Sequence, residues 1–309
     1  MQGHLVIAGG NVRSKNIYEE FLKFVDGGKV AIVPTASSDT RGTLIKFTDM
    51  FEQLGIKGDK KVSIKLDPDG EPDGDWKKSG DDFESLDFLN NVKGIWFTGG
   101  DQIKIIRSFL KSDGIETKLL KKFKDILNSG GVIGGSSAGA AIMSEIMIGG
   151  GTSLGALSMP YCEDYVEYRN DPQLEEEGML LITKGLGFFK FGIIDQHFDE
   201  ESRLGRLLEA LLDKKVNKGF GISEDTAMIC DIKTGDITIA GSGRVTIIDT
   251  SNAVRTKIGS LSKISNAKVN YLTNKEIYSI YKNHFDGAEN SYANIVMEMS
   301  PLAVKIENF

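Results

Sequence analysis

The sequence predicts an α/β fold with a mainly parallel sheet flanked by helices and antiparallel hairpins toward the C-terminal end. Short apolar, β-branched runs recur through the first two thirds of the chain, and amphipathic stretches separate them. Apolar strands that alternate with helices are typical of parallel β–α–β units, whose sheets are buried on both faces. After residue 219, short alternating runs are separated by glycine-containing turns. This second pattern predicts hairpins.

The elements follow in order along the chain. The predicted strands are residues 5–8, 30–33, 62–66, 95–98, 132–133 and 192–195, and the predicted helices are 17–25, 43–54, 103–110 and 117–127. The predicted hairpin strands are residues 226–230, 236–240, 244–248 and 253–258, which we expect to extend the same sheet. No linker rich in Pro or Ser interrupts the chain. We therefore expect residues 1–309 to form a single domain.

Composition excludes several function classes. The 309 residues carry 37 Lys and Arg against 44 Asp and Glu, a net charge of −7, which argues against a nucleic-acid partner. Cys162 and Cys230 are too few for a disulfide framework or a four-cysteine zinc site. The first apolar run begins at residue 5, and none approaches the roughly 20 residues that span a bilayer. We therefore expect a cytoplasmic protein without a signal peptide or a membrane partner.

Two acidic stretches and one glycine pair are interpreted structurally. In residues 67–75 an EF-hand starting at Asp69 would need Glu at its twelfth position, which is Gly80, so we predict a polar surface loop. Residues 160–177 are predicted to form a loop or surface helix. No phosphate-binding pattern follows Gly9 and Gly10, so we predict a tight turn near the active face. We expect neither a metal nor a cofactor.

The motif Gly-Ser-Ser-Ala-Gly at residues 135–139 is the most informative stretch. An apolar run precedes it and an Ala-rich run follows, which is the context of a nucleophile elbow. Such a turn exposes the central Ser137 at the start of a helix, where backbone N–H groups can stabilise an oxyanion. Ser137 is therefore the candidate nucleophile.

A serine nucleophile needs a base, and the chain contains three histidines. His4 precedes the first strand and His284 lies in a polar tail, whereas His197 follows the predicted strand 192–195 at its carboxyl end. Active sites of parallel sheets lie at that end. His197 is the candidate base.

The histidine needs a carboxylate to orient it. Glu224 ends another short apolar stretch and is the preferred residue, with Asp225 as its rival, since adjacent strand residues face opposite ways. The resulting order of serine, histidine and acid differs from that of α/β-hydrolases and disfavours an ordinary esterase.

Four ordered motifs resemble those of the cyanophycinases, serine exopeptidases related to the aspartyl dipeptidases. They are Phe-Thr-Gly-Gly-Asp-Gln at residues 97–102, Gly-Ser-Ser-Ala-Gly-Ala at 135–140, Asp-Gln-His-Phe at 195–198 with Arg-Leu-Gly-Arg-Leu at 203–207, and Gly-Ile-Ser-Glu-Asp at 221–225. The resemblance runs from about the first predicted strand to the hairpins after Glu224, which is most of the chain.

The resemblance implies a fold similar to the class I glutamine amidotransferases (flavodoxin-like), a homodimer, and metal-free release of β-Asp-Arg dipeptides from cyanophycin, a poly-aspartate with arginine on each β-carboxylate. Ser137, His197 and Glu224 would be nucleophile, base and orienting acid. Backbone N–H groups of Gly100 and Ala138 would stabilise the oxyanion. The residues that would line the substrate pocket are Gln102, Asp195, Gln196, Arg203 and Arg206.

One departure concerns the substrate. The family usually has a further arginine and a glycine where this chain has Glu201 and Ser202. A carboxylate there would repel an anionic substrate. Two alternatives therefore stay open: a related peptidase for other aspartyl or β-linked peptides, and a non-catalytic small-molecule-binding protein on the same scaffold.

Overall fold

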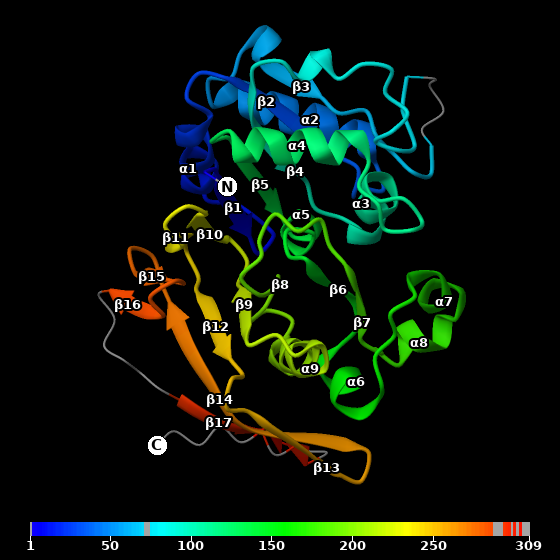
Figure 1. The fold of residues 1–309 in the computed structure, drawn as a ribbon, viewed down its shortest axis with the longest axis vertical. Coiled ribbons are helices and arrows are strands. Elements are labelled where there is room, and N and C mark those ends of the chain that lie inside the picture. The colour runs from blue at the N-terminus through cyan, green and yellow to red at the C-terminus, as the bar shows by residue number, and fades with distance from the viewer. Residues whose placement is uncertain (1, 71–74, 287–292, 298, 301–302, 305–309) are drawn as a thin grey trace.

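The computed structural model describes residues 2–70, 75–286, 293–297, 299–300 and 303–304, among which the central element is a nine-stranded sheet (Figure 1). One side of it is parallel, with the strands in the order β1 (His4–Ala8), β5 (Val132–Ser136), β4 (Val92–Phe97), β2 (Lys29–Val33) and β3 (Lys61–Ser63). The other side continues from β1 with antiparallel β10 (Thr226–Asp231), β11 (Asp236–Gly241), β15 (Ile277–Ser279) and β16 (His284–Asp286). The predicted fold class is confirmed.

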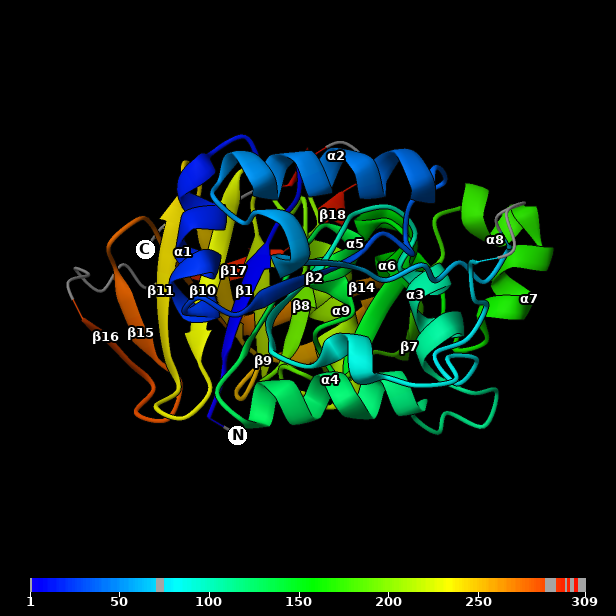
Figure 2. The same cartoon turned by 90° about the horizontal axis from the view of Figure 1, so that it is seen from above.

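Helices cover both faces of the parallel half (Figure 2). One face carries α1 (Lys15–Val25) and α2 (Thr40–Gln53), and the opposite face carries α4 (Lys118–Asn128), with α3 (Gln102–Phe109) in the same buried cluster. In α4 the buried residues recur at helical spacing: Leu119, Leu120, Phe123, Ile126 and Leu127. Because helices cover both faces, the central strands between them are mostly buried and apolar.

The hairpin strands predicted after residue 219 divide between two sheets. β10 and β11 extend the main sheet as expected, whereas the next two strands join a second sheet. The described strands of this second sheet are β8 (Ile193–Asp195), β9 (Lys218–Ile222), β12 (Val245–Asp249), β13 (Val254–Ile258), β14 (Leu261–Leu272) and β17 (Ala293–Met297). β8 and β9 pair in parallel across α9 (Leu204–Lys214). Alternation predicts which face of a strand is buried but not which sheet it joins, which explains the difference.

The two sheets share a buried cluster. Ile7 and Phe97 of the main sheet belong to the same cluster as Phe220 and Ile247 of the second. The opposite face of the second sheet packs on α9 and α6 (Ser153–Ser158). That the chain forms a single domain stays a prediction.

Shorter elements complete the described fold. They are η1 (Gly58–Lys60), η2 (Asp87–Leu89), α5 (Ala138–Ala141), β6 (Ile146–Gly150), α7 (Tyr165–Asn170), α8 (Pro172–Glu176), β7 (Leu181–Lys184), β18 (Met299–Ser300) and β19 (Ala303–Val304). The acidic residues 160–177 form the largely exposed α7 and α8.

The acidic stretch 67–75 is only partly a surface loop. Residues 71–74 lie outside the described residues, and Asp67 is buried, with Lys104 Nζ at 3.2 Å. In the described part of the chain, no three metal-ligating side chains cluster, and no helix has the length and apolarity to cross a bilayer.

Asp225 holds together the two segments in which the chain crosses from one sheet to the other. Residues 223–225 link β9 to β10, and residues 242–244 link β11 to β12. The buried Asp225 carboxylate accepts hydrogen bonds from the backbone N–H groups of Arg13 (2.7 Å) and Ser14 (2.6 Å) and from the hydroxyls of Ser14 (2.7 Å) and Ser242 (2.9 Å). Burial raises the pKa of Asp225, but these hydrogen bonds outweigh it and hold the pKa below its ordinary value.

We predict that Asp225→Ala lowers the free energy of unfolding by about 2–4 kcal/mol, because several buried donors lose their acceptor. Urea denaturation at neutral pH measures the change. A carboxylate with a lowered folded pKa stabilises the fold above its unfolded pKa, and this contribution is lost as the pH falls through the folded value. The difference from the wild type should therefore shrink below about pH 4.

The matched control is Asp49→Ala, at an exposed position of α2, which we expect to change the free energy of unfolding by less than about 0.5 kcal/mol. Equal stabilities of the Asp225 variant and the control would contradict the assigned role.

Candidate active site

Ser137 occupies a strained turn between β5 and α5. Its φ of 55° and ψ of −115° lie where non-glycine residues are rare. A Cβ atom at Gly135 would lie 2.5 Å from the Gly139 carbonyl oxygen, so this turn needs small residues. The predicted strand–turn–helix context is present, although α5 has only four residues.

His197 lies between Ser137 and Glu224. Its Nε2 is 2.9 Å from Ser137 Oγ, and its Nδ1 is 2.7 Å from Glu224 Oε1. The side chains of His197 and Glu224 are 18% and 24% exposed. An ionised carboxylate only accepts hydrogen bonds, so Nδ1–H donates to Glu224 and Nε2 accepts the Ser137 hydroxyl. The arrangement lets the imidazole take a proton from the serine.

Glu224 is held from its other side by Asn11. Asn11 Nδ2 donates to Glu224 Oε2 at 2.7 Å. The hydrogen bonds from Asn11 and from His197 lower the pKa of Glu224, so this carboxyl stays ionised into the acidic range. Sequence reasoning missed Asn11. Its signal was an amide directly after Gly9 and Gly10, at the end of the first strand.

The structure brings Glu224, and not Asp225, to the histidine. The Asp225 carboxylate bonds the backbone of Arg13 and the hydroxyls of Ser14 and Ser242. Glu224 and Asp225 point in different directions, as expected. They lie in a bend between two sheets, however, and not on a strand, so strand alternation is not the cause.

Three successive carbonyl groups at the end of β1 position these segments. The Ser137 N–H bonds the Ala8 oxygen (3.0 Å), the His197 N–H bonds the Gly9 oxygen (2.8 Å), and the Asp225 N–H bonds the Gly10 oxygen (2.9 Å). Gly10 has a φ of 119°, and a Cβ there would lie 2.3 Å from His197 Nε2. The predicted tight turn at Gly9 and Gly10 thus contacts the candidate base.

The loop at residues 99–100 lies against the candidate nucleophile. A Cβ at Gly99 would lie 3.2 Å from Ser137 Cβ, and Gly100 has a φ of 139°. Among the described residues, the backbone N–H groups of Gly100 and Ala138 make no hydrogen bond. Both donors are therefore available to a ligand.

Of the predicted substrate-binding residues, Asp195 and Arg206 bind each other. They are 1% and 4% exposed. Arg206 Nε and Nη2 donate to the two Asp195 carboxylate oxygens at 2.8 and 2.5 Å, and Nη1 donates to the Gly151 carbonyl at 2.6 Å. All three guanidinium nitrogens of Arg206 have protein partners. These contacts favour a structural role at the end of β8.

Of the other predicted substrate-binding residues, Arg203 and Gln102 also have protein partners for their side chains. Arg203 pairs with Glu201, and its Nη1 donates to the Gln196 carbonyl at 2.7 Å. Gln102 Nε2 donates to the Gly149 carbonyl at 2.8 Å. Gln196 is 5% exposed, and its Oε1 has no partner among the described residues. Glu201 therefore neutralises Arg203 locally instead of standing free. The substrate-binding roles of these residues stay predictions.

Comparisons with known proteins agree with the motifs. The sequence model of a family described as Peptidase family S51 matches residues 5–238. A cyanophycinase of Geminocystis herdmanii is 28% identical over 250 residues, covering 79% of this chain and 79% of that protein. A cyanophycinase of Synechococcus elongatus is 27% identical over 290 residues, covering 90% and 80%. The resemblance drawn from the motifs is confirmed.

One solved structure has the same fold. It is described as a peptidase from an acI-B1 Actinobacterium, with a TM-score of 0.58 at 17% identity, covering 90% of this chain and 97% of that one. The family match supports a peptidase over the non-catalytic alternative.

We predict that Gly10→Ala displaces the His197 ring, because the added methyl group would overlap it. Labelling of Ser137 by a serine-directed phosphonate should slow about tenfold or more. Gly55→Ala is the matched control, since Gly55 also has a positive φ (97°) but open space around its Cβ position. Equal labelling rates in the two variants would refute the contact.

We predict that Asn11→Ala raises the pKa of Glu224, because the ionised carboxylate loses its Asn11 hydrogen bond. NMR titration of the Glu224 carboxyl carbon measures this shift. Asn16→Ala, at an exposed position of α1, should leave it unchanged. A Glu224 pKa that does not move in Asn11→Ala would contradict the assignment.

Proposed function

Because this chain belongs to peptidase family S51, it is a peptidase, and we propose that it acts as an exopeptidase with Ser137, His197 and Glu224 as its catalytic triad. The observation that carries the proposal is the unbroken chain of hydrogen bonds from Glu224 through His197 to Ser137. Such a chain serves nucleophilic catalysis on acyl groups.

The first half of the reaction forms an acyl-enzyme. His197 Nε2 takes the Ser137 proton as Oγ attacks the scissile carbonyl, and the ionised Glu224 stabilises the imidazolium that results. The carbonyl oxygen becomes an oxyanion, which accepts hydrogen bonds from the free N–H groups of Gly100 and Ala138. His197 then protonates the leaving amine, and the C–N bond breaks.

The second half releases the acyl group. Water enters where the amine has left, and His197 takes its proton while the oxygen attacks the ester carbonyl. The same N–H groups stabilise the second oxyanion. Its collapse returns the proton to Ser137 and frees the carboxylic acid product. Each step uses only these residues and water.

The substrate we propose is cyanophycin, cleaved at its chain end to β-Asp-Arg dipeptides. The support is the set of curated relatives named cyanophycinase, at 26–28% identity over most of the chain. Glu201 favours the alternative of a related peptidase for other aspartyl or β-linked peptides, because it pairs with Arg203 and reduces the positive charge there.

The homodimer implied by the resemblance belongs to the same proposal. Native mass spectrometry of the full chain measures it, and a monomer at micromolar concentration would contradict it.

The triad makes a direct prediction: Ser137→Ala lowers kcat by about 10⁴-fold or more, because no acyl-enzyme can form. Glu224→Gln lowers kcat by about 10²–10⁴-fold, because the amide no longer stabilises the imidazolium. The matched control is Glu145→Gln, an exposed glutamate in the loop before β6, which should keep near-normal turnover. A folded Ser137→Ala protein with the turnover of the wild type would contradict the mechanism.

Incubation with a panel of peptides, followed by mass spectrometry, tests the substrate. The panel contains cyanophycin, short β-Asp-Arg polymers, α-Asp-X peptides and γ-linked peptides, each with wild type and Ser137→Ala. Release of β-Asp-Arg from chain ends by the wild type alone supports cyanophycin. Cleavage restricted to α-Asp-X or another linkage supports the alternative substrate class.

A further inference from the structure

A cavity of about 400 Å³ opens between the segment after β1 and helix α2. Its wall includes the three cationic side chains Arg13, Lys15 and Lys46, and it includes no carboxylate. Among the described residues none of these three cations forms an ion pair. Apolar side chains, among them Phe47 and Met50, complete the wall. The cavity thus combines three exposed cations, of which Arg13 also acts electrostatically on Glu224, with an apolar surface.

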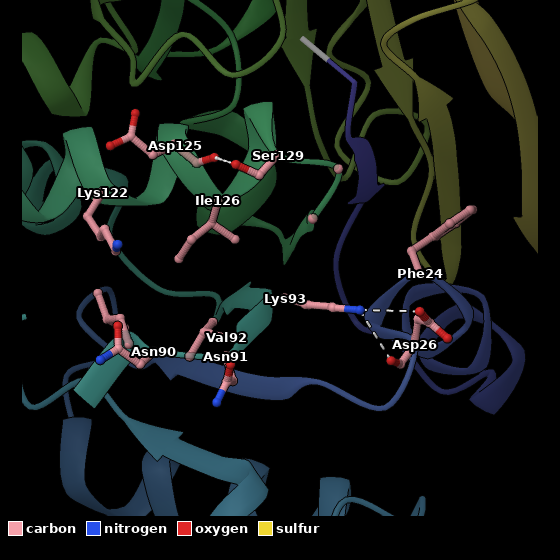
Figure 3. Close-up of a pocket in the computed structure, with 13 residues that line it drawn as sticks. Phe24, Asp26, Asn90, Asn91, Val92, Lys93, Lys122, Asp125, Ile126 and Ser129 are labelled. Carbon is pink, nitrogen blue, oxygen red and sulfur yellow. Dashed lines mark hydrogen bonds and ion pairs between the residues drawn. The ribbon is translucent and has the colours of Figure 1, made fainter. Parts of the chain in front are cut away.

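A cavity at the opposite end of the sheet differs in charge (Figure 3). It lies near the start of β4, and its wall contains Lys93 and Lys122 but also Asp26 and Asp125. Lys93 Nζ is 3.2 Å from Asp26. The positive charge of that wall is therefore balanced by carboxylates of the same wall, whereas the wall beside α2 contains no carboxylate.

The cationic cavity adjoins the triad through two of its wall residues. Ser136 directly precedes the nucleophile, and Asn11 holds Glu224 at 2.7 Å. Both stand at the carboxyl end of the parallel strands, where substrates of α/β folds bind. A substrate residue in extended conformation spans about 3.3 Å, so we expect a group one or two residues from the scissile bond to reach a cavity lined by these neighbours of the triad.

At the arginines predicted to bind substrate, positive charge is already compensated. Asp195 binds Arg206 in a buried bidentate pair, and Glu201 pairs with Arg203. A substrate carboxylate there would compete with protein carboxylates for the same guanidinium groups. The wall of the cavity beside α2, in contrast, contains three cations that form no ion pair with a described residue.

We propose that this cavity is the subsite that binds a carboxylate of the peptide substrate. The inference rests on the proposed peptidase function and adds to it the position of the anionic group. The carboxylate lies among Arg13, Lys15 and Lys46, and the adjoining methylene groups pack on the apolar wall. In a β-Asp-Arg substrate the carboxylate comes from arginine or from the end of the chain, and amidation of one or the other distinguishes these sources.

The test compares Lys15→Glu/Lys46→Glu with Lys121→Glu/Lys122→Glu, on α4, which changes the net charge equally. Each protein receives a short β-Asp-Arg polymer with free carboxylates, the same polymer amidated at its arginines, and the same polymer amidated at the chain end. The cavity variant should raise KM for the free peptide about tenfold, with kcat nearly unchanged. One amidated peptide should show a high KM in all proteins, which identifies the carboxylate. The α4 variant should behave as the wild type.

Binding of the same peptides to Ser137→Ala, with and without the cavity substitutions, separates the two proposals. If the peptides are hydrolysed but Lys15→Glu/Lys46→Glu leaves KM unchanged, the subsite is overturned and the peptidase function stands. The same holds if the double substitution raises KM equally for the free peptide and for both amidated peptides. Charge-dependent binding of the β-Asp-Arg polymer without its hydrolysis supports the subsite and overturns the cyanophycin assignment. Neither hydrolysis nor binding overturns both.

Discussion

The candidate site depends on three successive carbonyl groups at the end of β1, those of Ala8, Gly9 and Gly10. Each accepts one backbone N–H, from the segments that carry the serine, the histidine and the acid. Segments far apart in the sequence and divided between two sheets are thereby attached to one short stretch of backbone. Hydrogen bonds tolerate little variation in distance, so they fix the relative positions of the side chains that these segments carry.

The close packing of this stretch restricts which residues it can contain. A Cβ at Gly9 would lie 2.1 Å from the Ser223 carbonyl oxygen, so the chain there approaches the bend that carries Glu224 as closely as backbone can. Asn11 then reaches Glu224, and the N–H of Arg13 reaches Asp225. Asn11, which orients Glu224, is therefore a sequence neighbour of Arg13, which contacts Asp225 at the junction between the sheets. A change in the backbone of this stretch would affect both contacts.

Much of this was predictable from local pattern. Strands, helices and the elbow at Ser137 follow from periodicity and small residues, and His197 follows from its place after an apolar strand. What sequence could not supply depends on partners brought together by folding. That Asp195 neutralises Arg206, that Asn11 holds Glu224, and that β12 leaves the main sheet are contacts between distant segments. Residue type predicts an arginine's capacity to bind carboxylate but not which carboxylate it meets.

The base and the acid follow the two strands of one parallel unit, β8–α9–β9. Parallel neighbours require a crossover of a dozen or more residues, and His197 and Glu224 are 27 positions apart, of which the 11 residues of α9 are a part. The nucleophile comes from the other sheet, 60 positions before His197, across β6, β7 and surface helices. The number of residues between base and acid is thus set by one helical crossover, whereas the number between nucleophile and base tolerates insertions. In distant relatives we therefore expect the spacing from histidine to acid to vary little and the spacing from serine to histidine to vary widely.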